Sequence, residues 1–173
     1  MKKAVIVSDS HGLKRELELI KEKHKDGDLF IHCGDSELEE SDPAIAGFHT
    51  VKGNCDYYGD FPDEIVHELG GWRFFVTHGH LFSVKRSLMA LLYRAHETES
   101  QIICFGHSHM LGAEVVHNKL FINPGSIRQP RGRRERTYVV LHLDGDQIDF
   151  RVFDLEKGEL LDLRQSFSLP FNS

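Results

Sequence analysis

Residues 4–12 read A-V-I-V-S-D-S-H-G, a short apolar run that ends in polar residues and a glycine. A run of this length, bounded by turn-forming residues, is typical of a buried strand. Residues 13–25 follow, with charged side chains between four residues at helical spacing: Leu13, Leu17, Ile20 and His24. A second apolar run covers residues 29–33. This order of strand, helix and strand predicts an α/β fold with parallel crossover connections.

The rest of the chain divides into an α/β part and a β-rich part, with no linker or repeat between them. Further strands are expected at 48–53, 65–69, 73–77 and 102–105, and a helix at 83–96 with Ser83 as its N-cap. From about residue 113 onward, paired apolar runs flank the turns Asn118-Lys119 and Asp144-Gly145-Asp146. These runs predict two antiparallel hairpins. We expect one domain over residues 1–173.

The composition is that of an ordinary globular protein, with 40% hydrophobic and 28% charged residues. The net charge of −6 argues against general affinity for nucleic acid. The three cysteines form no CxxC pair, the N-terminal apolar run is too short for a signal peptide, and no run approaches a membrane span. We therefore expect a cytoplasmic protein with reduced thiols and no membrane partner. The sequence leaves the oligomeric state open, and a homo-oligomer is compatible with it.

Polar residues beside a glycine follow five of the predicted strands. The five blocks are Ser8-Asp9-Ser10-His11-Gly12, Gly34-Asp35, Gly53-Asn54, Thr77-His78-Gly79-His80 and Gly106-His107-Ser108-His109. In open α/β sheets, binding sites form outside the carboxyl ends of the strands. Seven side chains are therefore expected to converge: Asp9, His11, Asp35, Asn54, His78, His107 and His109.

Each block alone has an ordinary structural explanation. Asp9 and His11 could cap the following helix, and Asp35 and Asn54 could simply turn the chain. An H-x-H pair is expected by chance in a chain with 12 histidines. These explanations do not account for the recurrence of the same residue types at the same end of five strands.

A mixture of oxygen and imidazole ligands suits Mn²⁺, Fe, Co²⁺, Ni²⁺ or Zn²⁺ better than calcium. Seven ligands are too many for one metal and a reactive water. They suit two metals roughly 3.5–4 Å apart that share a bridging carboxylate. A neutral amide oxygen, such as that of Asn54, adds a ligand without adding charge.

The blocks D-x-H, G-D, G-N, H-G-H and G-H-x-H together resemble the calcineurin-like metallophosphoesterase superfamily. They occur in order over residues 8–109, and Asn123-Pro124-Gly125-Ser126 extends the match. The short length and the Gly-Asn-Cys-Asp block resemble the small YfcE/YsnB-type phosphodiesterase branch. This resemblance implies a four-layer α/β/β/α sandwich with two central mixed sheets flanked by helices.

The resemblance also implies a role for each ligand. Asp9, His11 and His109 would hold one metal, Asn54, His78 and His107 would hold the other, and Asp35 would bridge them. The implied reaction is hydrolysis of a phosphate ester by in-line attack of a metal-bound hydroxide. Asp35, Asn54 and His78 would act in catalysis through that hydroxide. Mn²⁺ is the favoured cofactor, and Ni²⁺, Fe, Co²⁺ and Zn²⁺ are alternatives.

Cys55 stands where many members of the superfamily have a histidine that protonates the leaving oxygen. A thiol of ordinary pKa is a poor acid for this purpose at neutral pH. Asp56 or His80 could compensate. The favoured interpretation of Cys55 is a small, partly buried side chain without a chemical role.

Residues 128–136 form an arginine-rich segment, R-Q-P-R-G-R-R-E-R. Arg128 and Arg131 could hold a substrate phosphate through forked guanidinium contacts, or the segment could be a solvated loop. Tyr57, Tyr58 and Phe61 could form a wall that binds a base or aryl group, but simple packing is favoured.

Three functions remain in competition. The favoured one is a metal-dependent phosphodiesterase that acts on a small phosphodiester or nucleotide-like substrate. A metal-dependent phosphatase or dinucleotide hydrolase differs only in substrate. The third is a protein-interaction scaffold on the same fold, similar to a retromer subunit. Such a scaffold would not need the complete set of metal ligands found here.

Overall fold

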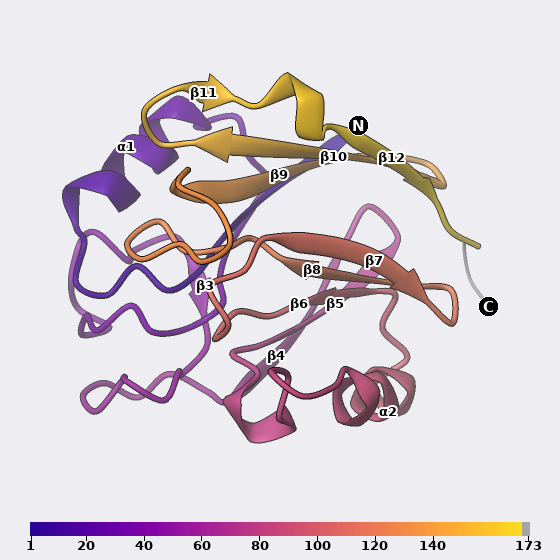
Figure 1. Cartoon of the computed structure of the whole chain (residues 1–173), viewed down its shortest axis with the longest axis horizontal. Helices are drawn as coiled ribbons and strands as arrows, with labels where there is room; N and C mark the ends of the chain where they lie inside the picture. Colours follow the sequence, from indigo (N-terminus) through magenta and orange to yellow (C-terminus); the bar gives the residue numbers. More distant parts are fainter. Residues whose placement is uncertain (171–173) are drawn as a thin grey trace.

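The structure is a computed structural model that describes residues 1–170, and its strands form two mixed sheets packed face to face (Figure 1). The larger sheet has the order β11-β10-β9-β1-β2-β3, with β12 paired to β10. Its strands are β1 (Lys2–Val7), β2 (Leu29–His32), β3 (His49–Thr50), β9 (Thr137–Asp144), β10 (Gln147–Asp154), β11 (Gly158–Glu159) and β12 (Gln165–Ser168). In this sheet β1, β2 and β3 are parallel, and β9 runs antiparallel to β1.

The smaller sheet has the order β4-β5-β6-β8-β7. Its strands are β4 (Glu64–Leu69), β5 (Trp72–Thr77), β6 (Ile102–Cys104), β7 (Gly112–Val116) and β8 (Lys119–Asn123). Strands β5, β6 and β8 are parallel, and the edge strands β4 and β7 are antiparallel to their neighbours. The α/β first half and the hairpin-rich second half of the chain therefore contribute to both sheets.

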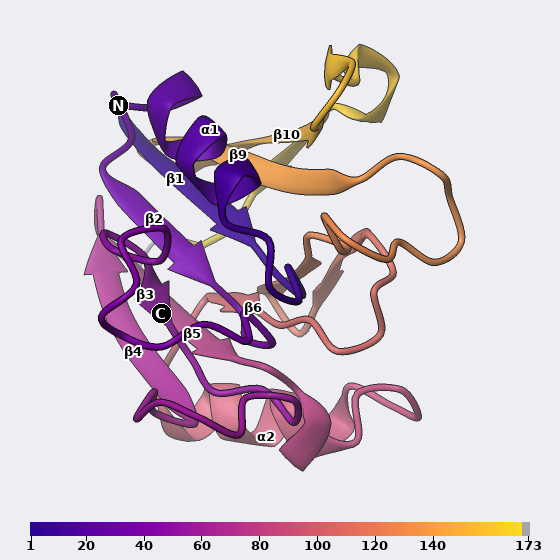
Figure 2. The same ribbon diagram turned by 90° about the vertical axis from the view of Figure 1, so that its left-hand side faces the viewer.

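Helices α1 (Arg15–Lys23) and α2 (Met89–Glu97) lie on opposite outer sides of the two sheets (Figures 1 and 2). Side chains alternate along the strands, so that Ile6 and Val76 join the core between the sheets while Val5 and Phe75 face outward. The outward face of the larger sheet packs on α1, and that of the smaller sheet packs on α2. The expected four-layer α/β/β/α sandwich is confirmed.

Several details differ from the sequence prediction. Strands β11 and β12 are not among the predicted strands, and Asp144, expected in the second turn, pairs with Gln147 at the end of β9. The helix predicted at 83–96 begins only at Met89, and Ser83 has a left-handed backbone with a φ of 51°, so it cannot cap a helix there. The first hairpin turns at His117 and Asn118, one residue earlier than expected, because both of these residues take the positive φ that a tight turn requires. The strand predicted at 48–53 is reduced to β3.

Two short 3₁₀ helices, His80–Phe82 and Leu161–Leu163, complete the secondary structure that the structure describes. Among residues 1–170, no helix has the length and apolar character needed to cross a membrane. The parallel strands β1, β2, β5 and β6 bring the polar blocks that follow them to one edge of the molecule. This edge carries the candidate site.

Candidate metal centre

The loops of the site hold the backbone in an uncommon conformation. Five of the seven predicted ligands have a left-handed φ: Asp9 (53°), His11 (41°), Asp35 (58°), His107 (72°) and His109 (61°). This region is unfavourable for residues with a β-carbon, and residues held there concentrate at functional sites. The left-handed turns reverse the chain directly after the strands and bring these side chains into one place.

The carboxylate of Asp9 lies at the centre of the group and is fully buried. Its Oδ2 accepts hydrogen bonds from the Ser8 hydroxyl at 2.5 Å and from the His107 amide at 3.1 Å. Its Oδ1 has no hydrogen-bond partner within residues 1–170. A buried carboxylate oxygen without a donor is costly, which indicates that a cation is needed beside it.

Three histidines present the same nitrogen to the site. Their Nδ1 atoms face acceptors: Glu37 Oε1 for His11 at 2.6 Å, the Cys33 carbonyl for His78 at 2.7 Å, and the Gln129 carbonyl for His109 at 2.8 Å. Each Nδ1 therefore carries the proton and donates it. In the neutral rings the Nε2 lone pairs are left facing the site, as is usual for histidines that bind metals.

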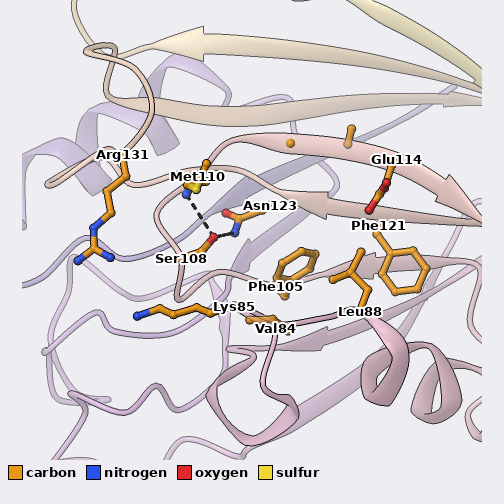
Figure 3. Close-up of a pocket in the computed structure, with 12 residues that line it drawn as sticks. Val84, Lys85, Leu88, Phe105, Ser108, Met110, Glu114, Phe121, Asn123 and Arg131 are labelled. Atoms are coloured by element: carbon orange, nitrogen blue, oxygen red, sulfur yellow. Dashed lines mark hydrogen bonds between the residues drawn. The ribbon is translucent and has the colours of Figure 1, made fainter.

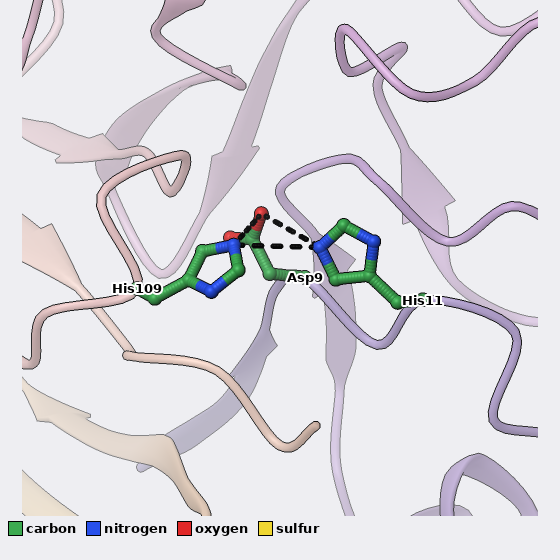
Figure 4. A group of neighbouring side chains, drawn as sticks. All are labelled: Asp9, His11 and His109. Atoms are coloured by element: carbon green, nitrogen blue, oxygen red, sulfur yellow. Dashed lines mark hydrogen bonds and ion pairs between the residues drawn. The ribbon is translucent and has the colours of Figure 1, made fainter. Parts of the chain in front are cut away.

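These lone pairs converge in a first group of acceptors. Nε2 of His11 lies 3.4 Å from Nε2 of His109, and Asp9 Oδ1 lies 3.2 Å from Nε2 of His109 (Figure 4). Three acceptors at such distances repel one another unless a proton or a metal ion lies among them. Ligand atoms of Asp9, His11 and His109 all lie within 4.8 Å of one another, a spacing suited to one metal ion.

A second group of acceptors surrounds Nε2 of His78. Asn54 Oδ1 lies 3.0 Å from this nitrogen, and Asp35 Oδ2 lies 3.2 Å from it. The two groups are in contact, because Asp9 Oδ1 is 3.7 Å from His78 Nε2 and Asp35 Oδ2 is 3.8 Å from His11 Nε2. The amide oxygen of Asn54 therefore points into the candidate site.

His107 lies at the side of the second group. Its ring centroid is 5.1 Å from that of His78. Burial, followed by the charge on His78, lowers the pKa of His107 to about 4, so the ring is neutral near pH 7. A neutral imidazole is the form that binds a metal ion.

The charges of the site favour a cation. Burial by itself would raise the pKa of Asp9 and of Asp35, but contacts with His109 and with His78 outweigh it and leave both pKa values below the usual range. Burial by itself would lower the pKa of His78, but contact with Asp35 and the charges of Asp9 and Asp35 outweigh it and raise this pKa. Contact with Asp9 raises the pKa of His109 against the smaller effect of burial. The field that holds protons on these rings would also attract divalent cations, which displace such protons.

The residues considered as auxiliary acids have different surroundings. Burial, and then the charge of Asp35, raise the pKa of Cys55 to about 11, so its thiol stays protonated. Asp56 is buried, and its carboxylate accepts three backbone N–H bonds, from Asp35, Gly53 and Glu37. Asp56 therefore ties together the loops that carry Asp35 and Asn54.

His80 remains near the site. Its ring centroid lies 5.4 Å from that of His78 and 6.1 Å from that of His107. Its Nδ1 is buried without a hydrogen-bond partner among the described residues. Burial lowers its pKa, with the charge on His78 adding to the effect. His80 is the auxiliary candidate whose ring lies among the ligand rings.

Of the residues predicted to contact the substrate, only some lie beside the candidate ligands. Arg131 is exposed, and its amide donates to the carbonyl of His109 at 3.0 Å, which places this arginine beside a candidate ligand. Arg128 is exposed, and its amide bonds to the Ser126 hydroxyl. Phe61 packs on the core beside α1 as expected. Packing is the wrong interpretation for Tyr57 and Tyr58, which are 82% and 79% exposed.

Sequence reasoning missed three residues that support the site. Ser8 donates to Asp9 Oδ2, the Ser126 hydroxyl donates to the Asp9 carbonyl at 2.7 Å, and Glu37 orients His11. Ser8 lies within the first polar block noted above, and Ser126 ends the Asn123-Pro124-Gly125-Ser126 segment that extends the match to the superfamily. Glu37 has no pattern of its own, because only the fold brings it to His11.

Comparisons with known proteins agree with this geometry. The family model of the calcineurin-like phosphoesterase superfamily domain matches residues 1–146, and the chain belongs to that superfamily. The chain is 49% identical over 166 residues to the probable metallophosphoesterase YsnB of Bacillus subtilis, with 95% of this chain and 98% of that protein covered. It is 30% identical over 171 residues to the phosphodiesterase YfcE of Escherichia coli, with 83% and 89% covered. The predicted branch is thereby confirmed.

Solved structures share the fold. A predicted phosphoesterase from Streptococcus pneumoniae has a TM-score of 0.92 and 36% identity, with 96% of this chain and 97% of that chain covered. Vacuolar protein sorting 29 from Cryptosporidium parvum has a TM-score of 0.78 at 19% identity, with 96% and 98% covered. At this identity the second likeness shows the fold alone. The chain is a member of a metallophosphoesterase family, and the family implies divalent metal ions.

Proposed function

We propose that this protein is a phosphodiesterase that uses two divalent metal ions. The observation that carries the proposal is that two groups of hydrogen-bond acceptors, one around Asp9 and one around His78, lie side by side. The two groups do not hold enough protons to separate all of these acceptors from one another. The neighbouring carboxylate of Asp35 lies 3.2 Å from His78 Nε2 and 3.8 Å from His11 Nε2, so it reaches both groups. This position supports the bridging role that the family resemblance implies for Asp35.

The ligands divide between two positions in this proposal. The first position has Asp9, His11 and His109, and the second has Asn54, His78 and His107, with Asp35 between them. When bound, two divalent metals lower the pKa of a water molecule and neutralise charge on the phosphoryl oxygens. The chain's own contribution is to orient the ligand nitrogens through their Nδ1 partners.

The environment of Cys55 limits the range of substrates. A thiol with a pKa of about 11 donates a proton poorly at neutral pH. Esters whose leaving group needs no protonation, such as aryl esters, are therefore the expected good substrates. The similar protein YfcE is named a phosphodiesterase, which supports a diester rather than a monoester.

The resident metal is proposed to be Mn²⁺, with Ni²⁺, Fe, Co²⁺ and Zn²⁺ as alternatives of similar ligand preference. The test begins with metal-depleted protein that is reconstituted with each metal in turn. Metal analysis should find about two ions per chain. Turnover should then be measured with phosphodiesters, phosphomonoesters and dinucleotides that carry matched leaving groups.

The results separate the competing functions. Two ions per chain with preference for diesters supports the proposal. Preference for monoesters would replace it with a phosphatase, and preference for dinucleotides joined through a pyrophosphate would replace it with a dinucleotide hydrolase. Retention of at most one ion at saturating Mn²⁺, with no turnover of any ester, would refute it and leave the scaffold function as the explanation of the fold.

A further inference from the structure

A pocket of about 550 Å³ lies beside the candidate metal centre, and Figure 3 shows the residues that line it. The segment before α2 and the outer face of the smaller sheet line it, and it is open to solvent. Its lining includes Ser108, which stands between the candidate ligands His107 and His109. None of the seven candidate ligands lines the pocket itself. It is therefore a separate space that opens next to the reacting centre.

One end of the pocket carries two positive charges. Figure 3 shows Lys85 and Arg131 at the same end, and both side chains are exposed. Within residues 1–170, neither of them forms an ion pair or a side-chain hydrogen bond, in contrast to Arg73 and Arg94. Because Arg131 also bonds through its amide to His109, this cationic end is the end next to the metal centre.

The middle of the pocket is apolar. Phe105 and Phe121 lie along its floor, and Val84 and Leu88 lie beside them (Figure 3). Met110 is 54% exposed and contributes a thioether to the lining. Thioethers and aromatic edges are favourable neighbours for a flat aromatic ring.

The opposite end of the pocket is acidic. Figure 3 shows the Glu114 carboxylate near Phe121, away from Lys85. Glu114 is exposed, and its carboxylate has no ion-pair or hydrogen-bond partner within the part of the chain that the structure describes. The pocket therefore runs from cations through an apolar middle to a hydrogen-bond acceptor, and an occupant must have the complementary order of groups.

The Ser108 hydroxyl adds a donor at the cationic end. Its Oγ accepts a hydrogen bond from Asn123 Nδ2 at 2.9 Å and another from the Met110 amide at 3.4 Å. The hydroxyl proton has no acceptor among residues 1–170, so it is free to donate to an oxygen of an occupant. A phosphate or ribose oxygen at this end would be such an acceptor.

We propose that this pocket binds the nucleoside half of the substrate, with an amino-bearing base at the Glu114 end and the phosphate at the Lys85 end. This inference rests on the proposed function, because it names the group esterified to the phosphate that is hydrolysed. The volume of the pocket lies within the range of roughly 300–1,000 Å³ that is usual for small-molecule sites. The occupant is thus a nucleotide ester rather than a simple alkyl diester.

The chain offers a substitution that fills the pocket without removing any group. Gly112 lies on β7, and a Cβ built there meets nothing within 4 Å. Side chains alternate along a strand, so residue 112 shares the face of Glu114 and points to the pocket. Gly112→Leu should occupy the apolar middle, and Val115→Leu, on the opposite face of β7, is the matched control.

The activity test uses two esters with one leaving group, the p-nitrophenyl ester of AMP and methyl p-nitrophenyl phosphate. Water cleaves the same P–O bond in both and releases nitrophenolate, with AMP or methyl phosphate as the other product. Gly112→Leu should lower kcat/KM for the AMP ester by about tenfold or more, because the stacking of one base contributes to binding by a factor of this magnitude. The methyl ester should change by less than about twofold. Equal effects on both esters would overturn the inference.

A binding test separates this inference from the proposed function. Metal-depleted wild-type protein is titrated with AMP and with ribose 5-phosphate, which lacks the base, in a calorimeter. AMP should bind about tenfold more tightly, and Gly112→Leu should remove the difference. Equal affinities in the wild type would refute the subsite even if Gly112→Leu failed to fold. AMP selectivity without hydrolysis of any ester would refute the phosphodiesterase and keep the subsite.

Discussion

Asp56→Asn should weaken the protein through the two loops that carry Asp35 and Asn54. Oδ2 of Asp56 accepts the amides of Asp35 at 2.8 Å and Gly53 at 2.7 Å, and Oδ1 accepts the amide of Glu37 at 2.8 Å. The side chain is only 2% exposed, so water does not replace these bonds. Asparagine has the same shape, but it offers one acceptor oxygen in place of two.

The magnitude follows from the best placement of the new amide. With its oxygen at the Oδ2 position, asparagine keeps two hydrogen bonds but loses their charge assistance, about 1 kcal/mol for each. Its NH₂ group then faces the N–H of Glu37, which leaves a buried donor unsatisfied at a cost of about 1–3 kcal/mol. We expect a loss of about 3–5 kcal/mol in the free energy of unfolding. Asp56→Ala would strand three donors, which approaches the whole stability of many domains.

Urea unfolding followed by circular dichroism measures this loss, provided that the m-value is unchanged. Asp60→Asn is the matched control, because Asp60 is exposed and the substitution removes the same charge; it should change stability by less than about 0.5 kcal/mol. A loss below about 1 kcal/mol for Asp56→Asn would refute the conclusion that Asp56 stabilises the protein by joining these two loops. Full stability with turnover lost only for esters of basic leaving groups would instead restore Asp56 as the general acid.

Asp35→Asn should reduce kcat/KM more than His107→Gln, because it removes a negative charge from between two cations; near wild-type turnover with both metals bound would contradict the bridging role. Cys55→Ala should change kcat/KM for aryl diesters by less than about threefold, because a thiol with a pKa of about 11 is a poor acid; a large loss confined to alkyl esters would show that the thiol is the acid. Burial lowers the pKa of His24 and of His32 to about 4, below the ordinary 6.5. The unfolded chain therefore binds more protons between these values, and the free energy of unfolding should fall as pH drops from about 6.5 to about 4, by about 3 kcal/mol for each ring. In urea titrations at pH 7 and pH 4.5, His24→Gln should reduce the loss of stability between the two pH values by about 2–3 kcal/mol, and an unchanged loss would show that His24 does not titrate in this range.

Much of the site was accessible from the sequence because strand ends are local features. A short apolar run followed by Asp or His and glycine predicts both a buried strand and a polar loop at its carboxyl end. The parallel arrangement of β1 with β2 and of β5 with β6 then brings those loops together. The start of α2 could not be predicted in the same way, because apolar spacing continues through residues 84–88 while the left-handed backbone of Ser83 prevents a helix there.

The sequence by itself determined the order of the elements from β1 to β10, the family and the residue types available as ligands. Only the tertiary structure decided which nitrogen of each histidine faces the site, because the Nδ1 partners lie 20 to 45 residues away along the chain. It also decided that Asp56 accepts three amides from two loops, that one oxygen of Asp9 has no donor within residues 1–170, and that a charged pocket adjoins the candidate metal centre. These properties arise from contacts between loops of different strands. Apolar periodicity reports the burial of each segment but not which polar atoms of two segments meet.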